Sequence, residues 1–131
     1  MTGSYDEVAG ACKNIRNFCE DSKVSKDICD KIEICLTEAL NNVIKHSYKG
    51  ESDKEIEIKV RKKRKIFEID ILDSGEARSC FEKPKLEFDP KDIENLPESG
   101  MGLFIIEEIM DETHYRIQDG KNIFTMRKFI L

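Results

Sequence analysis

Hydrophobic residues recur with helical spacing in the first third of the chain. Over residues 5–20, one apolar stripe is formed by Val8, Cys12, Ile15 and Cys19. Over residues 25–48, apolar residues again fall three and four positions apart, as on the buried face of a helix. Ser25 is a suitable N-cap for this second stretch, and Gly50 is a suitable stop. The pattern predicts two helices, over residues 5–20 and 25–48.

The hydrophobic period then changes to two. In residues 55–60 and 67–71, isoleucine, valine and phenylalanine alternate with charged residues, which is typical of strands with one buried face. The basic run Arg61–Lys65 separates these stretches, so the pattern predicts a β-hairpin with a charged turn. Acidic residues flank the basic run on both sides, which favours a solvated turn over a nucleic-acid patch.

The C-terminal half is predicted to hold a loop, a helix and a second hairpin. Residues 74–99 contain all three prolines and many charges, which indicates a long loop, and loops of this length are usually functional or disordered. Apolar spacing predicts a helix over residues 102–112. The turn pair Asp119-Gly120 separates predicted strands at residues 113–118 and 122–131.

This order of elements predicts an α+β fold. Helices gather on one side and antiparallel strands on the other, as in a two-layer α/β sandwich. A length of 131 residues suits one domain, residues 1–131, with a core of ordinary size.

Composition narrows the functional classes. Charged residues are 37% of the chain and the net charge is −5, which argues against direct nucleic-acid binding. No apolar stretch approaches the roughly 20 residues that cross a bilayer, and residues 1–7 lack the features of a secretory signal. We therefore expect a cytoplasmic protein without membrane association.

The five cysteines are an odd number and include no Cys-x-x-Cys pair. Four of them fall in predicted helices, where a free cysteine packs as a small hydrophobic residue. Reduced thiols are therefore favoured over disulfides. The only histidines, His46 and His114, do not stand at ligand spacing from a cysteine pair, so no zinc site is expected.

Polar residues interrupt the apolar pattern of the second predicted helix. Glu38 and Asn42 are four residues apart and therefore project from one helix face. The side-chain oxygen of Asn42 suits Mg²⁺ beside phosphates, and Glu38 suits a proton acceptor for a hydroxyl. Lys45 is placed to reach a phosphate. Taken alone, these residues are better explained as an ordinary solvated helix face.

Two glycine turns carry the other candidate chemistry. Asp73-Ser74-Gly75 follows a strand, and its carboxylate suits an adenine amino group while the glycine lets the base approach the backbone. Gly100-Met101-Gly102-Leu103 opens a helix whose exposed N–H groups suit a phosphate. The third glycine of a Rossmann loop and the lysine of a P-loop are both absent. Each turn alone also fits an ordinary connection.

The three features together, in this order and spacing, resemble one family. Residues 36–48 look like the N-box of the histidine-kinase-like (Bergerat-fold, GHKL) ATPases. Asp73-x-Gly75 looks like their first glycine box, and Gly100-x-Gly102-Leu103 like their second. The N-box with Glu38, Asn42, His46 and Tyr48, together with residues 96–106, most resembles the bacterial anti-sigma-factor serine kinases.

The resemblance implies a Bergerat ATP-binding fold with a mainly antiparallel sheet and an ATP lid at residues 76–99. Asn42 would hold Mg²⁺ at the phosphates of ATP or ADP, with Lys45 and His46 lining that part of the site. Asp73 would bind adenine with Thr125 assisting, and Gly75 would shape the base pocket. The phosphates would lie on the backbone of Gly100, Met101, Gly102 and Leu103.

The resemblance also implies an activity and partners. Glu38 would act as the general base on a serine or threonine of a STAS-type anti-sigma-factor antagonist. The protein would also sequester a sigma factor, as a homodimer. Family members begin with a strand before the first helix, but Met1–Glu7 is too short and polar to supply one. The glycine that many relatives carry two residues after the first glycine box is Ala77 here, so a tighter base pocket is expected.

Two other functions fit the same motifs. The first is an ATP-gated binding module that sequesters a regulatory partner with little catalysis. The second is a sensor-kinase catalytic domain, which is disfavoured because the chain has no separate helical segment carrying a phospho-acceptor histidine. His46 lies inside the N-box, and His114 begins a predicted strand.

Overall fold

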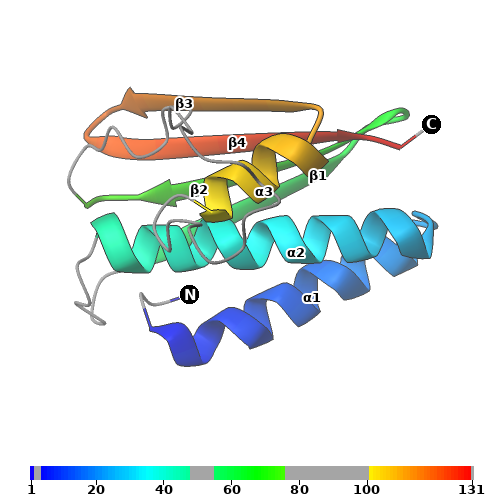
Figure 1. Ribbon diagram of the computed structural model, residues 1–131, viewed down its shortest axis with the longest axis horizontal. Helices are drawn as coiled ribbons and strands as arrows, with labels where there is room; N and C mark the ends of the chain where they lie inside the picture. Colours follow the sequence, from blue (N-terminus) through cyan, green and yellow to red (C-terminus); the bar gives the residue numbers. More distant parts are fainter. Residues whose placement is uncertain (2–3, 48–54, 76–100, 131) are drawn as a thin grey trace, which may run out of the picture.

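The computed structural model describes residues 1, 4–47, 55–75 and 101–130. Helices form one layer and a four-stranded antiparallel sheet forms the other (Figure 1). The predicted α+β two-layer sandwich is therefore confirmed. The predicted stop at Gly50 and most of the predicted 74–99 loop fall outside the described residues.

The helical layer begins with a short 3₁₀ turn, Tyr5–Glu7, that leads into α1, Val8–Asp21. Helix α2 spans Lys26–Asn42 and begins as predicted at Ser25, whose hydroxyl accepts a hydrogen bond from the Ile28 N–H at 3.4 Å. A π-helical turn, Val43–Ser47, continues α2. Helix α3 covers Met101–Ile109.

The strands are β1 (Ile56–Lys62), β2 (Ile66–Asp73), β3 (Glu112–Gln118) and β4 (Lys121–Phe129), in the spatial order β1-β2-β4-β3. Both predicted hairpins are present, and β2 and β4 join them at the centre of the sheet.

The predicted helix over residues 102–112 ends earlier than expected. Helix α3 stops at Ile109, and Glu112 already pairs with Arg127 in the sheet. The reason lies in Asp111, whose side chain accepts a hydrogen bond from the Phe129 N–H at 2.6 Å. Residues 111–112 are thereby held to β4 instead of extending the helix.

The core lies between the helices and one face of the sheet. Phe67, Ile69 and Ile71 of β2 pack against α2, whose inward residues include Leu36 and Leu40, and all five are at most 1% exposed. Cysteines also belong to this core: Cys12, Cys19, Cys29 and Cys35 are buried and free. The expectation of buried thiols is confirmed for these four, and Cys80 lies outside the described residues.

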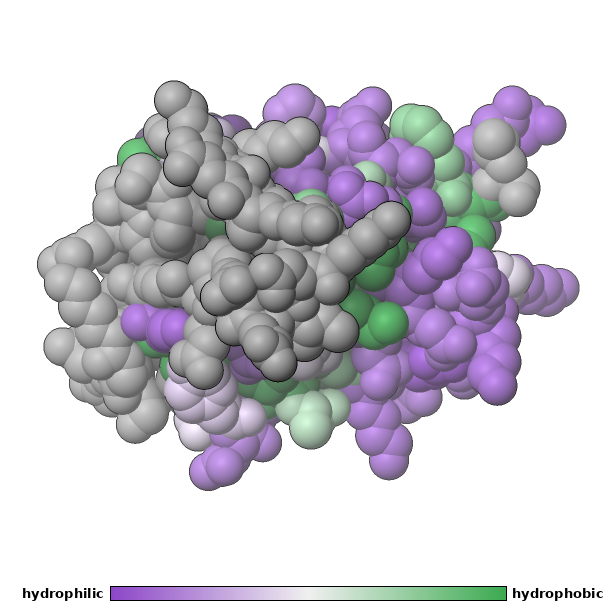
Figure 2. Space-filling view, in the orientation of Figure 1, coloured by the Kyte–Doolittle hydropathy of each residue, from purple (hydrophilic) through white to green (hydrophobic). Residues whose placement is uncertain are grey.

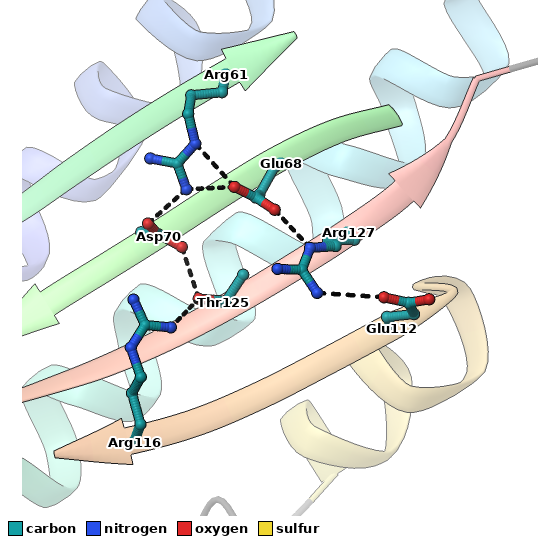
Figure 3. Close-up of polar contacts among 7 residues, drawn as sticks. All are labelled: Arg61, Glu68, Asp70, Glu112, Arg116, Thr125 and Arg127. Carbon is teal, nitrogen blue, oxygen red and sulfur yellow. Dashed lines mark hydrogen bonds and ion pairs between the residues drawn. The ribbon is translucent and has the colours of Figure 1, made fainter. Parts of the chain in front are cut away.

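The opposite face of the sheet carries a layer of buried charge instead of a second set of helices (Figure 3). Glu68 and Asp70 are each only 5% exposed. Arg61 contacts both carboxylates, and Arg127 contacts Glu68 from the other side. These arginines form ion pairs and hydrogen bonds with carboxylates whose burial would otherwise be energetically unfavourable.

The surface matches the high charge of the sequence. Where described residues are visible in Figure 2, hydrophilic residues dominate and hydrophobic ones form small, separate areas. None of the helices in the described ranges has the length and apolar character that a membrane crossing requires.

Candidate nucleotide site

Several elements end or begin on one side of the molecule (Figure 1). Helix α2 and strand β2 end there, and helix α3 and strand β4 begin there. The register explains the placement of the strands, because Asp73 at the end of β2 is paired with Ile56 on one side and Asn122 on the other. The topology therefore gathers the three predicted motifs toward the same end of the fold.

Asp73 is the best-defined residue of the site. Its side chain is 3% exposed, and its Oδ1 accepts hydrogen bonds from the Gly75 N–H at 3.0 Å and from Asn122 Nδ2 at 2.9 Å. Within the described ranges, both hydrogen bonds to this carboxylate reach Oδ1. The geometry thus leaves Oδ2 as the oxygen suited to accept a hydrogen bond from a ligand amino group.

Asn122, which the sequence analysis does not single out, lies beside Asp73 in the candidate site. Its Nδ2 also donates to the Gly75 carbonyl oxygen at 3.0 Å, and its Oδ1 accepts from the Tyr115 hydroxyl at 2.8 Å. These contacts fix the orientation of its amide. Asn122 therefore braces both the carboxylate of Asp73 and the glycine turn that follows it.

Thr125 does not lie beside Asp73, contrary to the expectation that it assists Asp73 in binding the adenine base. Side chains alternate along a strand, and Thr125 is three positions from Asn122, which places it on the opposite face of the sheet. There its hydroxyl donates to Asp70 at 2.6 Å and accepts from Arg116 at 3.3 Å (Figure 3). Only the β2–β4 register, which pairs Asn122 with Asp73, identifies Asn122 as the neighbour of that carboxylate.

The N-box residues lie at the end of α2. Glu38 and Asn42 are both half-buried and share a helix face, as their spacing predicts. A surface hollow of about 470 Å³ reaches Glu38 and is also lined by Arg16, Asp30, Glu33, Ile34 and Thr37. This hollow gives the Glu38 carboxylate open access from outside the helix layer.

The π-helical turn begins directly after Asn42 and contains Lys45 and His46. Lys45 is exposed, and the side chain of His46 lies outside what the structure describes. Such wide turns occur frequently at functional sites, because they re-aim the residues that follow. Here the turn changes the direction of Lys45 relative to an uninterrupted helix.

The second glycine box begins α3. Met101 and Gly102 form the first residues of the helix, and Leu103 is buried in the core at 7% exposure. Gly100 lies outside the described residues. The buried Leu103 anchors the helix start, whose N–H groups and positive dipole end suit a phosphate.

The chemistry of the described residues fits a nucleotide better than a metal held by protein alone. No group of three or more His, Cys, Asp or Glu residues within the described ranges is arranged to hold a metal ion. An amide oxygen such as that of Asn42 is a single neutral ligand. It suits Mg²⁺ only where phosphate oxygens supply the other ligands.

Comparison with known proteins places the chain among nucleotide-binding domains. The family model of the histidine kinase-like ATPase domain matches residues 1–128. Serine-protein kinase RsbW of Listeria innocua is 31% identical over 110 residues, which cover 81% of this chain and 69% of that protein. Serine-protein kinase RsbW of Oceanobacillus iheyensis is 34% identical over 110 residues, covering 81% and 68%.

Solved structures agree with this fold. Histidine kinase AdeS of Acinetobacter baumannii superposes with a TM-score of 0.51 at 22% identity, over 78% of this chain and 47% of that one. A blue-light activated histidine kinase domain of Erythrobacter litoralis gives 0.53 at 12% identity, over 78% and 44%. This chain spans less than half the length of either, and at these identities the likeness shows the fold alone. By the family model and by its relatives, the chain belongs to the histidine kinase-like ATPase domain family, in the branch that includes the serine-protein kinases named RsbW.

Proposed function

We propose that this protein binds Mg·ATP and transfers the γ-phosphoryl group to a serine or threonine of a protein substrate. The observation that carries the proposal is the Asp73–Asn122–Gly75 cluster, which holds a buried carboxylate at the edge of the fold where α2 ends. Membership in the ATPase family and the names of the RsbW relatives support it.

Each site residue has a proposed role in holding the nucleotide. Asp73 accepts a hydrogen bond from the adenine amino group, and Gly75 allows the base to approach the backbone. The backbone of residues 100–103 binds the phosphates, together with Lys45 and His46. Asn42 would hold Mg²⁺, which would neutralise phosphate charge.

Glu38 is proposed as the general base. It takes the proton of the substrate hydroxyl as that oxygen bonds to the γ-phosphorus. The bond from phosphorus to the β–γ bridging oxygen breaks, and that oxygen leaves with ADP. The open hollow at Glu38 is compatible with a hydroxyl presented by another protein.

The partners are proposed from the resemblance to the anti-sigma-factor kinases. The substrate is a STAS-type anti-sigma-factor antagonist, and a sigma factor is sequestered by the same protein, acting as a homodimer. The serine-protein kinase names of the relatives support phosphorylation of a protein and do not bear on the identity of that protein.

A phosphotransfer assay with Mg·ATP and a STAS-domain protein tests the activity. Glu38→Gln is expected to lower the transfer rate by about 10²-fold or more while ATP affinity is retained. Glu108→Gln, an exposed carboxylate of α3, serves as the control and should leave the rate unchanged.

Two results would separate the alternatives. If the protein binds the nucleotide but no phosphoserine or phosphothreonine forms, the result would contradict the kinase proposal and favour the ATP-gated binding module. Failure to bind Mg·ATP at all would overturn both proposals.

A further inference from the structure

A hollow lies at the end of the molecule opposite the candidate nucleotide site (Figure 1). Both α2 and β2 begin at this end and run toward that site. The hollow has a volume of about 360 Å³ and lies between the α1–α2 turn, the β1–β2 turn and the end of β4. Segments that are distant in the sequence therefore build one surface here.

The hollow combines an apolar floor with a cationic rim. The floor is formed by three buried or half-buried residues that belong to the core or pack against it, Val24, Ile28 and Ile130. The rim carries three exposed cations, Lys23, Lys62 and Arg64. Two serines complete the lining, and no carboxylate is among the described residues that line it. We refer to this surface as the cationic hollow.

Backbone hydrogen bonds hold the walls of the cationic hollow in place. The Ile130 N–H donates to the Lys65 carbonyl oxygen at 2.9 Å, which joins the end of β4 to the β1–β2 turn. On the helix side, the Val24 N–H donates to the Cys19 carbonyl oxygen at 3.1 Å. The shape of the hollow is thus fixed by the same contacts that close the fold at this end.

The acidic residues that flank the basic run in the sequence do not neutralise these cations in the fold. Glu68 is buried against Arg61 and Arg127, and Asp70 is buried against Arg61. In the part of the chain that the structure describes, no side-chain ion pair or hydrogen bond is made by Lys23, Lys62 or Arg64. The rim therefore presents its positive charge to groups outside the molecule.

Lys23 also has a backbone conformation that favours glycine. Its φ is 63°, in the left-handed region that glycine adopts without steric cost and that other residues seldom adopt. Residues held in such conformations cluster at functional positions. Here the lysine supplies a cation to the rim of the hollow, where glycine would suit the turn better.

These features fit an acidic protein segment better than a nucleic acid or a free phosphate. An apolar centre inside a polar rim is the usual anatomy of a protein interface. Single-stranded nucleic acids stack their bases on aromatic side chains, and none of the described residues that line the hollow is aromatic. A free phosphate would leave the apolar floor uncovered.

Charge disfavours a two-fold contact between copies of this chain. Such a contact places the same surface of both copies together. Lys23, Lys62 and Arg64 would then face identical cations without an anion from either hollow, which is unfavourable. A head-to-tail contact instead forms rings or open filaments, which sedimentation detects.

We propose that the cationic hollow is a docking site for an acidic segment of a partner protein, which places one apolar side chain on the floor and carboxylates beside Lys23, Lys62 and Arg64. The four consecutive cations of residues 62–65 attract such a segment over a longer range. The inference is independent of the proposed kinase function, because the hollow lies at the other end of the fold.

Three capped, fluorescent heptapeptides serve as probes for the full chain. The first has a central leucine with two acidic residues on each side, the second has glutamine in place of the acidic residues, and the third has glycine in place of leucine. By anisotropy, the first should bind about tenfold more tightly than either of the others. It should also slow the chemical acetylation of Lys23 and Lys62, but not that of Lys13 on the exposed side of α1.

Lys23→Gly is the decisive variant. It removes a cation from the rim and suits a φ of 63°, so the melting temperature should stay equal or rise. Affinity for the acidic leucine peptide should fall about tenfold, and Lys23→Arg should keep it. Asp119→Gly, at the other described non-glycine residue with positive φ, 53°, is the matched control outside the hollow and should bind normally.

Several results would overturn the proposal. These are equal binding of the acidic and glutamine peptides, equal binding of the leucine and glycine peptides, no binding of the first peptide at millimolar concentration, or unchanged affinity in Lys23→Gly. Tighter binding of inorganic phosphate or of single-stranded DNA would assign the hollow to phosphate groups. Self-association that Lys23→Gly weakens would assign it to a second copy, and both results would equally overturn the proposal.

Discussion

Asn122 of β4 and Asp73 of β2 meet through a 2.9 Å hydrogen bond from Nδ2 to Oδ1. The second proton of that amide goes to the Gly75 carbonyl oxygen. One residue of the last strand thus holds both the carboxylate and the turn of the first glycine box. The shape of the proposed base pocket depends on β4 as much as on the motif itself.

Replacement of Asn122 tests this dependence. Asn122→Ala removes the donor to Asp73 and frees the Gly75 turn, and loss of a buried hydrogen bond to a charged group costs about 1–3 kcal/mol. We expect ATP affinity to fall by about tenfold or more in titration calorimetry. Lys121→Ala, at the exposed neighbouring position, is the control. Unchanged affinity in the Asn122 variant would show that the brace is dispensable.

The two buried aspartates of β2 provide a matched pair. Asp73 and Asp70 lie on the same strand but on opposite faces, and both are at most 5% exposed. Mg·ATP at 100-fold over its Kd should stabilise the wild-type protein by about 2.7 kcal/mol. Asp73→Asn should abolish the shift in melting temperature, because an amide has one acceptor oxygen where the carboxylate has two. Asp70→Asn should retain the shift, although the melting temperature of this variant without ligand is lower.

If both variants kept the shift, Asp73 would not be the base-binding residue. If both lost it, the outer face would be coupled to the nucleotide site. Either result would contradict the assignment made from the hydrogen bonds around Asp73.

The outer-face charge layer predicts acid sensitivity. The hydrogen bond from Arg127 and the contacts of Arg61 lower the pKa of Glu68 from 4.5 to about 2, although burial alone would raise it. A carboxylate whose pKa is lower in the folded state stabilises the fold above its ordinary pKa and loses that effect as the pH falls toward the folded value. Because both arginines are partly exposed, we expect a contribution of about 1–3 kcal/mol.

The measurement is the free energy of unfolding by urea between pH 6 and pH 2.5, for the wild type and for Glu68→Gln. The difference between the two should be largest at pH 6 and should shrink steadily below pH 4.5. A difference that stays constant across this range would show that the charge of Glu68 contributes nothing.

The buried thiols are predicted to be unreactive. Cys19 and Cys35 are fully buried, and burial raises the pKa of each to about 12. Since the thiolate is the reactive form, alkylation of these two by iodoacetamide at pH 8 should be at least ~100-fold slower in the folded protein than in urea. Site mapping by mass spectrometry would identify them, and rapid labelling of Cys35 in the folded protein would contradict the burial.

Most of the fold follows from periodicity in the sequence. Three- and four-residue spacing located α1 and α2, and two-residue alternation located both hairpins, because each element buries one face. The predicted end of α3 is wrong, since Met110 continues the apolar pattern while Asp111 is held to β4. The spacing of apolar residues along the chain carries no information about a tertiary hydrogen bond of that kind.

The site was predictable only in part for a similar reason. Motif order predicts Glu38, Asn42 and Asp73 as site residues, because each motif belongs to a single element. The partner of Asp73 depends on how β2 and β4 align, and a shift of one residue in that alignment reverses every side chain. The family resemblance implies Thr125 as the assisting residue, whereas the register pairs Asn122 with Asp73. The π-helical turn after Asn42 also has no signature in residue spacing.

The strand order β1-β2-β4-β3 has a consequence for how the protein folds. The two hairpins join neighbouring segments, whereas β2 and β4 are distant in the chain, with Asp73 and Asn122 49 positions apart. Local hairpins form within microseconds, while long-range pairing must first overcome the entropy of closing a large loop. The β2–β4 docking step should therefore limit the folding rate. During synthesis on the ribosome, the nucleotide site cannot assemble until β4 has emerged.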